Sequence, residues 1–498
     1  MTQHLAAALD LGSTSARAVL VDADGEVVAQ ASRPTDPQFP QRGWVELDPG
    51  HLWRGLRDSL EEALTSVGAT TDDIVGAGVT TSRETCLVWD RATGEPVHPA
   101  IMWMSKQTDE IVARWRSEGR DEEFRRRTGL FNDSFFSAAK LAWILETVPG
   151  VRERADAGEL AAGTLDTWLV WNLTSGRNHV TDTSEASRTA LFSLDELAWD
   201  ETLCAVAGVP MALLPKVLDS DGDFGEVRPA EVGLPGSSPF RISAVMGDQM
   251  AGMFGQACTT AGTVKNTYGT AGVLTANTGE RPALLDGLTA SVGWTLEGRT
   301  DYEAEGVVFH SGQTLQWMRE KLKIMAPDEH SQDVAAQVPD TGGVYVVPAF
   351  AGLCAPHWAR GASASIVGLT LESTAAHVVR AGLEAMAYQT RDNVEAFRSG
   401  GFEVPELRVD GGATTNDLVC QIQADVLGIP VLRPRQLERT AIGVAHVAGV
   451  AGGLWKLGDL AARWEVERVF EPQMSEDQRE DKYAGWQAAV RTVIGQRG

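Results

Sequence analysis

The first residues with clear chemical potential form one polar stretch near the start of the chain, residues 10–15 (DLGSTS), followed by Arg17. A carboxylate, several hydroxyls and a tight glycine turn are groups that can hold Mg²⁺ and phosphate oxygens in sites without a Walker lysine. Taken alone, such a stretch is more often an ordinary hairpin turn. It indicates a phosphate site only if other parts of the chain repeat its chemistry.

Two later turns repeat this combination of glycine and hydroxyl. Thr270 lies in the sequence YGT at a predicted strand end, and the turn at residues 411–413 (GGA) lies between the strand ELRVD and a helix start at Asn416. A strand followed by a glycine turn and a helix aims backbone N–H groups at an anion. Three such turns in one chain favour a nucleoside triphosphate as the ligand.

Charged side chains follow two other predicted strands. Arg83 and Glu84 come shortly after the strand at residues 74–80, and Asp248 ends the apolar strand at residues 242–246. A carboxylate at the carboxyl end of a strand is where α/β enzymes place chemistry. In isolation, Arg83 and Glu84 are better explained as a surface ion pair, and Asp248 is equally well explained as a helix cap.

The elements that would position these side chains alternate between strands and helices. Residues 5–30 predict a strand, a polar turn and further strands, and residues 262–280 predict a shorter hairpin of the same kind. Apolar residues three and four apart predict helices between them, a pattern typical of α/β proteins. We therefore expect two duplicated domains, residues 1–252 and 253–498, with a hinge near residues 250–262.

Composition narrows the classes of function. With 43% hydrophobic and 22% charged residues, the 498-residue chain is an ordinary globular protein with a core that needs no disulfide or metal. The 43 basic and 68 acidic residues give a net charge of −25, which disfavours nucleic acid as a partner. Five widely spaced cysteines favour reduced thiols in the cytoplasm, and neither a signal peptide nor an apolar run long enough for membrane insertion is evident.

Two common classes of hydrolase lack support. The nine histidines show no metal-ligand spacing, and no G-x-S-x-G motif is present. Zinc and serine hydrolase chemistry are therefore not expected.

Taken together, these motifs resemble the FGGY carbohydrate kinases, and most closely the glycerol kinases among them. The resemblance covers nearly the whole chain, in segments that include ALDLGSTSARAVL, WVELDP, SRETCLVWDRATGEPVHPAIMW, GDQMAGMFGQAC, KNTYGT, VVPAFAGLCAPHW, AYQTRDNVEAF and VDGGATTND. It implies an α/β fold of two actin-like, ribonuclease-H-like ATPase domains around a central cleft. The duplicated hairpins agree with that expectation.

The resemblance also implies a reaction, namely transfer of a phosphoryl group from ATP to a small polyol, glycerol first of all, with the help of Mg²⁺. Asp248 would accept the proton of the attacking hydroxyl, and Asp10 and Asp248 would position Mg²⁺, partly through water. The implied acceptor-binding residues are Arg83, Glu84, Trp103, Phe135, Asp248, Gln249 and Val273. The implied nucleotide-binding residues are Ser13, Thr14, Ser15, Arg17, Thr270, Gly312, Gln316, Gly412 and Asn416.

Three departures from the glycerol kinase pattern concern the acceptor. Phe135 stands where a tyrosine is usual, Val273 stands where a phenylalanine is usual, and residues 103–108 (WMSKQT) replace a W-x-D-R-R-like run. A lost hydrogen bond is typically worth about 1 kcal/mol, so glycerol would bind more weakly without loss of the chemistry. The smaller Val273 could leave room for another carbon, and a four-carbon polyol is an alternative acceptor.

An alternative of a different class is a non-catalytic, actin-like nucleotide-binding regulator, because that fold also serves proteins without small-molecule chemistry. The presence of Asp10, Arg83, Glu84 and Asp248 argues against it, since a binding module needs no proton acceptor. Relatives are usually homodimers or homotetramers, so an oligomer is expected.

Overall fold

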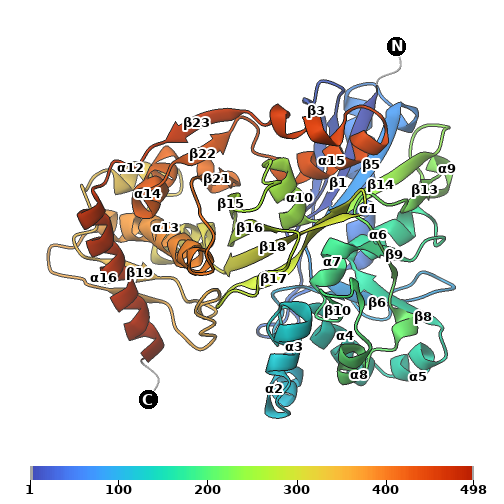
Figure 1. Cartoon of the computed structure of the whole chain (residues 1–498), viewed down its shortest axis with the longest axis horizontal. Coiled ribbons are helices and arrows are strands. Elements are labelled where there is room, and N and C mark those ends of the chain that lie inside the picture. The colour runs from blue at the N-terminus through green and yellow to red at the C-terminus, as the bar shows by residue number, and fades with distance from the viewer. Residues whose placement is uncertain (1–3, 496–498) are drawn as a thin grey trace.

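The computed structural model describes residues 4–495 and contains two α/β halves, each built around a mixed sheet (Figure 1). The strands of the N-terminal sheet are, in spatial order, β13 (Gly225–Val227), β14 (Phe240–Gly247), β5 (Ile74–Thr81), β1 (Leu5–Leu11), β2 (Ser15–Val21) and β3 (Val27–Pro34). The strands of the C-terminal sheet are β17 (Thr289–Leu296), β18 (Arg299–Val308), β16 (Gly272–Gly279), β15 (Val264–Tyr268), β21 (Leu407–Asp410), β22 (Val431–Pro434) and β23 (Val466–Phe470).

The two sheets share one topology. In the N-terminal sheet β1 and β2 form an antiparallel hairpin, β5 runs parallel to β1, and β14 runs parallel to β5. In the C-terminal sheet β15 and β16 form the hairpin, with β21 parallel to β15 and β22 parallel to β21. The prediction of duplicated α/β halves is confirmed, and each predicted phosphate turn lies at an end of a parallel strand.

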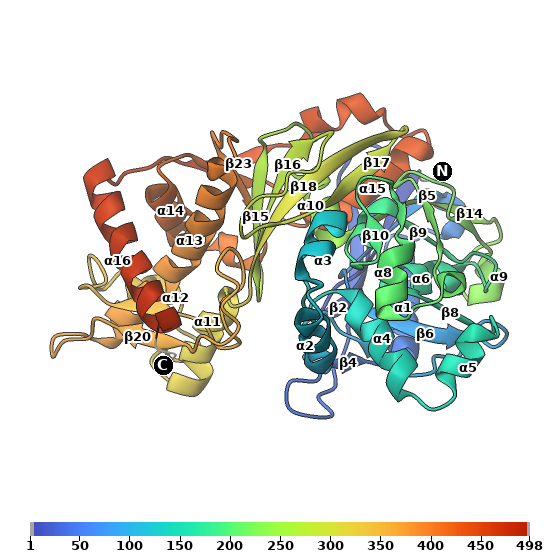
Figure 2. The same ribbon diagram turned by 60° about the horizontal axis from the view of Figure 1, so that its bottom comes forward.

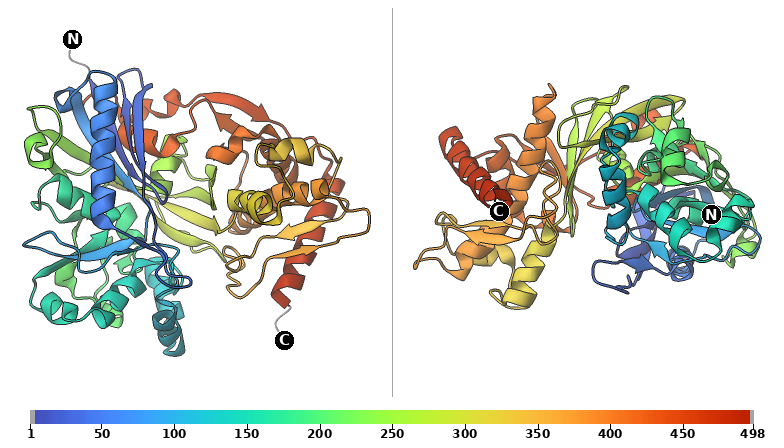
Figure 3. Two further views of the ribbon diagram at one scale, coloured as in Figure 1. Left: turned by 180° about the vertical axis from the view of Figure 1, so that it is seen from behind. Right: turned by 90° about the horizontal axis from the view of Figure 1, so that it is seen from below.

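Helices cover both faces of the N-terminal sheet, whose central strands are mostly apolar. All seven residues of β1 are buried, which is typical of a strand covered on both faces. Helix α1 (Pro49–Ser66) covers one face and begins at Asp48, whose side chain accepts from the N–H groups of Gly50 and His51. Helices α10 (Asp248–Gly255) and α15 (Arg439–Ala451) cover the other face (Figure 3).

Helix α15 comes from the C-terminal part of the sequence but packs on the N-terminal sheet. A Cβ atom added at Gly76 would lie 2.5 Å from the carbonyl oxygen of Ala448, and one added at Gly78 would lie 2.6 Å from that of Val444. Only glycine in β5 therefore allows the helix backbone to approach so closely. The apolar cluster at this contact joins Ala6, Ala8 and Val19 to Ala441 and Val444.

The remaining elements extend the two halves. A small sheet consists of β4 (Glu46–Leu47), β7 (Ala100–Ile101), β6 (Cys86–Asp90) and β8 (Leu160–Thr164) and packs with α4 (Ser137–Thr147), α5 (Val151–Asp156) and α6 (Leu165–Leu173). Helices α2 (Asp109–Ser117) and α8 (Glu201–Ala207) pack on α4, and α3 (Asp121–Thr128) follows α2 in the chain. Helix α7 (Thr183–Ser187) packs on β14 and β17. The C-terminal half carries α11 (Gly312–Trp317), α13 (Ala375–Ser399), α14 (Asp417–Leu427), α16 (Glu476–Gly495) and the strand pair β19 (Tyr345–Val347) and β20 (Ser365–Val367). Strands β15 to β18 run between the two halves in Figure 2.

Two expectations from composition can be compared with this fold. All five cysteines are buried and unpaired, as expected for reduced thiols. No helix within residues 4–495 combines the length and the apolar character needed to cross a membrane.

Candidate active site

A cavity of about 380 Å³ lies between the two halves and collects most of the residues predicted from the sequence. All seven predicted acceptor-binding residues line it, together with three predicted nucleotide-binding residues: Arg83, Glu84, Trp103, Phe135, Asp248, Gln249, Val273, Ser13, Thr14 and Thr270. It adjoins a wider cleft of about 650 Å³ that Thr270 also lines. Side chains from strand ends more than 200 residues apart in the sequence thus line the same cavity.

Arg83 and Glu84 lie in a tight turn between β5 and β6, and both are almost completely buried. The Thr85 N–H donates to the Arg83 carbonyl at 2.7 Å, and Glu84 has a φ of +64°. Such a backbone conformation is uncommon for glutamate, and residues held in it cluster at functional sites. The turn therefore directs two oppositely charged side chains into the cavity rather than to the surface, where an ordinary ion pair would lie.

Each of these side chains has a buried partner of opposite charge. The Arg83 guanidinium lies 2.6 Å from Glu305 of β18, and Arg188, directly after α7, donates to Glu84 at 2.6 Å. Burial acts to lower the pKa of Arg83, but Glu305, Glu84 and Asp248 outweigh it and raise that pKa well above its usual value. Arg83 is a permanent cation in the cavity wall.

Asp248 is the first residue of α10 and lies at the carboxyl end of β14. Its Oδ1 accepts from the Gln249 N–H at 2.7 Å and from Arg83 Nε at 3.0 Å. The hydrogen bonds leave Oδ2 without a partner among the described residues, and the side chain is 24% exposed. A carboxylate oxygen facing a cavity can accept a proton from a bound hydroxyl group.

The aromatic part of the cavity is formed by Trp103 and Phe135, whose ring centroids lie 5.4 Å apart. The Trp103 ring N–H donates to Ser13 Oγ at 2.8 Å, so the acceptor wall is tied to the first phosphate turn. Val273 lines the same cavity from β16 and pairs in register with Val307 of β18. The aliphatic side chains of Val273 and Val307 thus line the same cavity as the aromatic pair.

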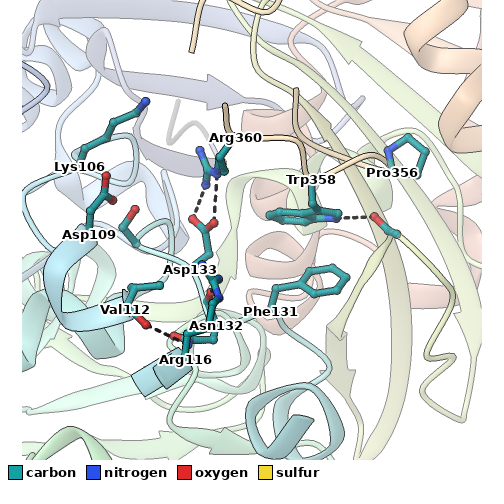
Figure 4. A pocket seen from close by; sticks show the side chains of 12 residues that line it. Lys106, Asp109, Val112, Arg116, Phe131, Asn132, Asp133, Pro356, Trp358 and Arg360 are labelled. Atoms are coloured by element: carbon teal, nitrogen blue, oxygen red, sulfur yellow. Dashed lines mark hydrogen bonds and ion pairs between the residues drawn. The ribbon is translucent and has the colours of Figure 1, made fainter. Parts of the chain in front are cut away.

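Phe135 is held by two contacts of its own loop. The buried ammonium of Lys140 donates to the carbonyls of Ser134, Phe135 and Phe136, and burial lowers its pKa to about 8. The Asp133 carboxylate accepts a hydrogen bond from the Phe135 N–H at 2.9 Å. It also accepts one at 3.1 Å from Nε of Arg360, a residue of the C-terminal half (Figure 4). Asp133, Arg360 and Trp358 also line a neighbouring cavity of about 560 Å³. Figure 4 shows the Asp133–Arg360 pair next to Trp358 in its wall.

The third departure, at residues 103–108, lies mostly outside the acceptor cavity. Gln107 is buried beside Ser105 and Glu46, away from the cavity, and accepts from Ser105 Oγ at 2.8 Å. Lys106 lines the neighbouring cavities instead. Ser105, Lys106 and Gln107, which stand in place of the D-R-R part of the run, are not among the residues that line the acceptor cavity, whereas Trp103 and Met104 are.

The turns predicted to hold the nucleotide meet at one edge of the C-terminal sheet. The Gly312 N–H donates to the Gly269 carbonyl at 3.1 Å, which places the start of α11 beside the turn that carries Thr270. Strand β21, which ends in the turn of Gly411 and Gly412, pairs with β15 directly before this point. Gly411 has a φ of +89°, and an added Cβ would lie 2.5 Å from the Tyr268 carbonyl, so only glycine fits.

Six of the nine predicted nucleotide residues lie outside the lining of this cavity, namely Ser15, Arg17, Gly312, Gln316, Gly412 and Asn416. Ser15 begins β2, and Arg17 is occupied by ion pairs with Asp10 and Glu438. Gln316 is exposed on α11, where it donates to Glu320 at 2.8 Å. The Asn416 side chain caps α14 by accepting from the Leu418 N–H at 2.9 Å, which is the structural role of such a residue.

The carboxylates available for a divalent cation are few. Asp10 is buried at the end of β1, and desolvation raises its pKa above the usual range even though Arg17 acts in the opposite direction. Within residues 4–495 no cluster of three or more histidine, cysteine or acidic side chains is arranged to hold a metal alone. One or two carboxylates fit Mg²⁺ that takes its other ligands from nucleotide phosphates and water.

Sequence reasoning missed several residues that support this site. Arg188 and Lys265 lie in segments that carry the family resemblance, but the sequence assigns them no role, and Glu305 and Lys140 lie outside those segments. Lys265 donates to both Gln249 and Thr267 from β15. The one signal available was their charge within otherwise apolar or small-residue segments, such as YEAEGVVF at residues 302–309. A charged side chain in a buried strand needs a partner of opposite charge, but the sequence pattern does not identify that partner.

Comparisons with known proteins agree with this geometry. Residues 5–255 match the FGGY family of carbohydrate kinases, N-terminal domain, and residues 264–452 match its C-terminal domain. The chain is 47% identical to the glycerol kinase of Thermus brockianus over 490 residues (98% of each chain) and 46% identical to that of Stenotrophomonas maltophilia over 497 residues (99% of each). The crystal structure of Plasmodium falciparum glycerol kinase with ADP superposes with a TM-score of 0.90 at 30% identity, covering 99% of this chain and 98% of that one. The chain belongs to the FGGY family of carbohydrate kinases.

Proposed function

We propose that this protein is an ATP-dependent kinase that converts glycerol to sn-glycerol 3-phosphate. The observation that carries the proposal is the single cavity lined by Arg83, Glu84, Trp103 and Asp248, with the Thr270 turn on the same wall. Relatives named glycerol kinase, 46% and 47% identical over nearly the full length, support the choice of glycerol. A regulator without catalytic activity would need neither the buried cation nor the free carboxylate oxygen.

In the proposed reaction the acceptor lies between the charged turn and the aromatic pair. Arg83 and Glu84 hydrogen-bond the hydroxyl groups, and the Trp103 ring packs on the carbon chain. Asp248 accepts the proton of the terminal hydroxyl of the polyol. The oxygen of that hydroxyl forms a bond to the γ-phosphorus of ATP while the bond from the γ-phosphorus to the bridging β-phosphate oxygen breaks, which releases ADP. The main contribution of the protein is the alignment of the two reactants.

On the donor side, the turns at Ser13–Thr14, Thr270 and Gly412 offer backbone N–H groups and hydroxyls to the phosphates. Gly312, Gln316 and Asn416 would lie along the rest of the nucleotide, with Ser15 and Arg17 behind the phosphates. Asp10 and Asp248 would hold Mg²⁺, partly through water. When bound, Mg²⁺ would neutralise charge that develops on the transferring phosphoryl group.

The setting of the enzyme is also part of the proposal. A net charge of −25 and buried, unpaired cysteines fit a cytoplasmic protein that binds no nucleic acid. A homodimer or homotetramer is expected from the family resemblance.

A four-carbon polyol is the second candidate acceptor, favoured by the aliphatic wall of Val273 and Val307 and by the missing hydroxyl of Phe135. Val273→Phe separates the two acceptors. If the side chain at residue 273 limits the length of the acceptor, the ratio of kcat/KM for glycerol to kcat/KM for erythritol or threitol should be higher in this variant than in the wild type. An unchanged preference would contradict the four-carbon hypothesis.

The decisive experiment is an ADP-release assay with Mg-ATP and a panel of glycerol, erythritol, threitol, xylitol, dihydroxyacetone and xylulose. Turnover of glycerol is expected, with kcat reduced by roughly 10²- to 10⁴-fold in Asp248→Asn, the usual range for a lost proton acceptor. Turnover confined to a longer polyol would replace glycerol as the acceptor. No turnover of any panel member would contradict the kinase proposal and favour the nucleotide-binding regulator.

A further inference from the structure

Arg188 is a completely buried arginine that lies outside the acceptor cavity but is hydrogen-bonded to the side chains that shape it. It follows α7, and its side chain has no exposed surface. Its Nε donates to Glu84 Oε1 at 2.6 Å, and its Nη2 donates to Glu305 Oε1 at 2.6 Å. One guanidinium therefore joins an acceptor-binding carboxylate to a carboxylate of the C-terminal sheet.

The chain of charges continues from Glu305 back into the cavity. The second oxygen of Glu305 lies 2.6 Å from Arg83 Nη1, and Arg83 Nε donates to Asp248 at 3.0 Å. Charges thus alternate from Glu84 through Arg188, Glu305 and Arg83 to Asp248. Since the groups in the middle of this array are buried, each depends on its neighbours for compensation of its charge.

The orientation of Arg188 is fixed from a third side. Its Nη1 donates to the hydroxyls of Thr289 at 3.2 Å and Ser291 at 3.1 Å, both on β17. The planar guanidinium is held in one orientation because its Nε, Nη1 and Nη2 all donate hydrogen bonds. A lysine ammonium cannot reproduce this set of hydrogen bonds. The array is a rigid support behind the turn in which Glu84 has its unusual φ.

We propose that Arg188, acting through Glu84 and through Glu305 and Arg83, is a positioning residue that sets the affinity for the acceptor. The proposal rests on the proposed function, because Arg83 and Glu84 must bind the acceptor hydroxyls. Without Arg188, the buried carboxylates of Glu84 and Glu305 would lose the cation that lies between them. The turn of Arg83 and Glu84 would then lose its fixed geometry. The turns of Thr270 and Gly412 have no bond to Arg188, so ATP binding does not depend on it.

A purely structural role for Arg188 predicts something different. In that case the loss of Arg188 would lower the thermal stability and reduce the amount of active enzyme. The KM values for acceptor and ATP would be unchanged, because the enzyme that remains folded would bind both substrates normally. Arg391 provides the matched control, because it is also a buried arginine but does not line the cavity. It donates to the Val426 carbonyl at 3.1 Å and to Glu480 at 2.7 Å.

The test measures kcat, both KM values and the thermal midpoint for the wild type, Arg188→Met, Arg188→Lys and Arg391→Met, using the full chain with Mg-ATP. In Arg188→Met the glycerol KM should rise at least tenfold while the ATP KM stays within twofold. Arg188→Lys should recover part of the loss, because it restores the charge but not the three donor directions. Arg391→Met should lower only the thermal midpoint. A glycerol KM within twofold of the wild-type value in soluble Arg188→Met would overturn the proposal.

A milder variant decides the matter if Arg188→Met is insoluble. The double variant Thr289→Val, Ser291→Ala removes two hydroxyl partners of Arg188 and leaves every charge in place. The glycerol KM should then rise about threefold at constant ATP KM, and an unchanged value would contradict the proposal. A wild type that turns over another polyol of the panel instead of glycerol would refute the choice of glycerol, and the same comparison would then be made with that polyol.

Discussion

The acceptor side and the nucleotide side of the cleft are built in opposite ways. The acceptor side uses charged side chains that are buried and paired with each other, such as Arg83 with Glu305. The nucleotide side uses exposed turns of glycine and small polar residues, such as Gly269–Thr270 and Gly412. A small neutral polyol offers only hydroxyl groups, so its recognition needs fixed, strong hydrogen-bonding groups. A nucleotide brings its own charge, and backbone N–H groups suffice to hold it.

The largest effect is expected when the cation of the acceptor side is removed. Arg83→Met leaves Asp248 without its cation and Glu305 with Arg188 as its remaining one, and breaking a buried ion pair costs roughly 3–5 kcal/mol. We expect a large fall in the thermal midpoint and a loss of kcat/KM for glycerol of at least about 100-fold, which corresponds to roughly 3 kcal/mol. Calorimetry and the ADP-release assay measure the two effects. Near-normal turnover would mean that the acceptor is bound elsewhere.

A glycine substitution tests the nucleotide side. A Cβ added at Gly412 meets no protein atom within 4 Å, so it would project only into the space proposed for the nucleotide. Gly412→Ala should leave the thermal midpoint and the glycerol KM unchanged and raise the ATP KM about tenfold, which corresponds to roughly 1.4 kcal/mol. Gly458→Ala, equally free of neighbouring atoms, is the control. Equal ATP KM values in the two variants would remove Gly412 from the nucleotide site.

A smaller effect is expected from pH on the acceptor side. Burial lowers the pKa of Lys140 to about 8, so its ammonium loses a proton as the pH rises through 8. A neutral amine holds the carbonyls around Phe135 less strongly, since charge-assisted hydrogen bonds are about twice as strong as neutral ones. The glycerol KM should rise about fivefold between pH 7.5 and 9, a change worth roughly 1 kcal/mol, while the ATP KM is unchanged.

The control for this pH effect is Lys140→Met, which should show the raised glycerol KM without the pH step. Stability should respond in the opposite direction. Because the unfolded chain holds this proton up to the ordinary lysine pKa of 10.5, the contribution of Lys140 to the free energy of unfolding rises with pH between 8 and 10.5. A pH step that persists in Lys140→Met would assign it to another group.

The smallest effect is expected from restoring a hydroxyl group. Phe135→Tyr adds a hydrogen-bonding group beside Trp103, and a net hydrogen bond contributes about 1 kcal/mol. The glycerol KM should fall several-fold with no change in the ATP KM. A higher glycerol KM would show that the cavity has no room for the hydroxyl and that the aromatic wall has adapted to phenylalanine.

The sequence predicts the strand ends of this site better than their supports. The hairpin turns with Ser13 and Thr270 and the strand end at Asp248 are local patterns, and their predicted positions agree with the fold. Arg188 and Glu305 lie about a hundred residues or more from their partners, and only tertiary packing brings them together. The position of α15 could not be predicted either, because an apolar helix does not indicate which sheet it covers.

The way α15 crosses between the halves has a consequence for protein engineering. The chain cannot be divided at residue 252 into two independently folding modules, because a fragment ending there would leave Ala6, Ala8 and Val19 without their cover. Such a fragment would expose an apolar sheet face to water and to other copies of itself. A split or permuted version of this kinase would need to keep residues 439–451 on the same polypeptide as the N-terminal sheet, or supply them as a second chain.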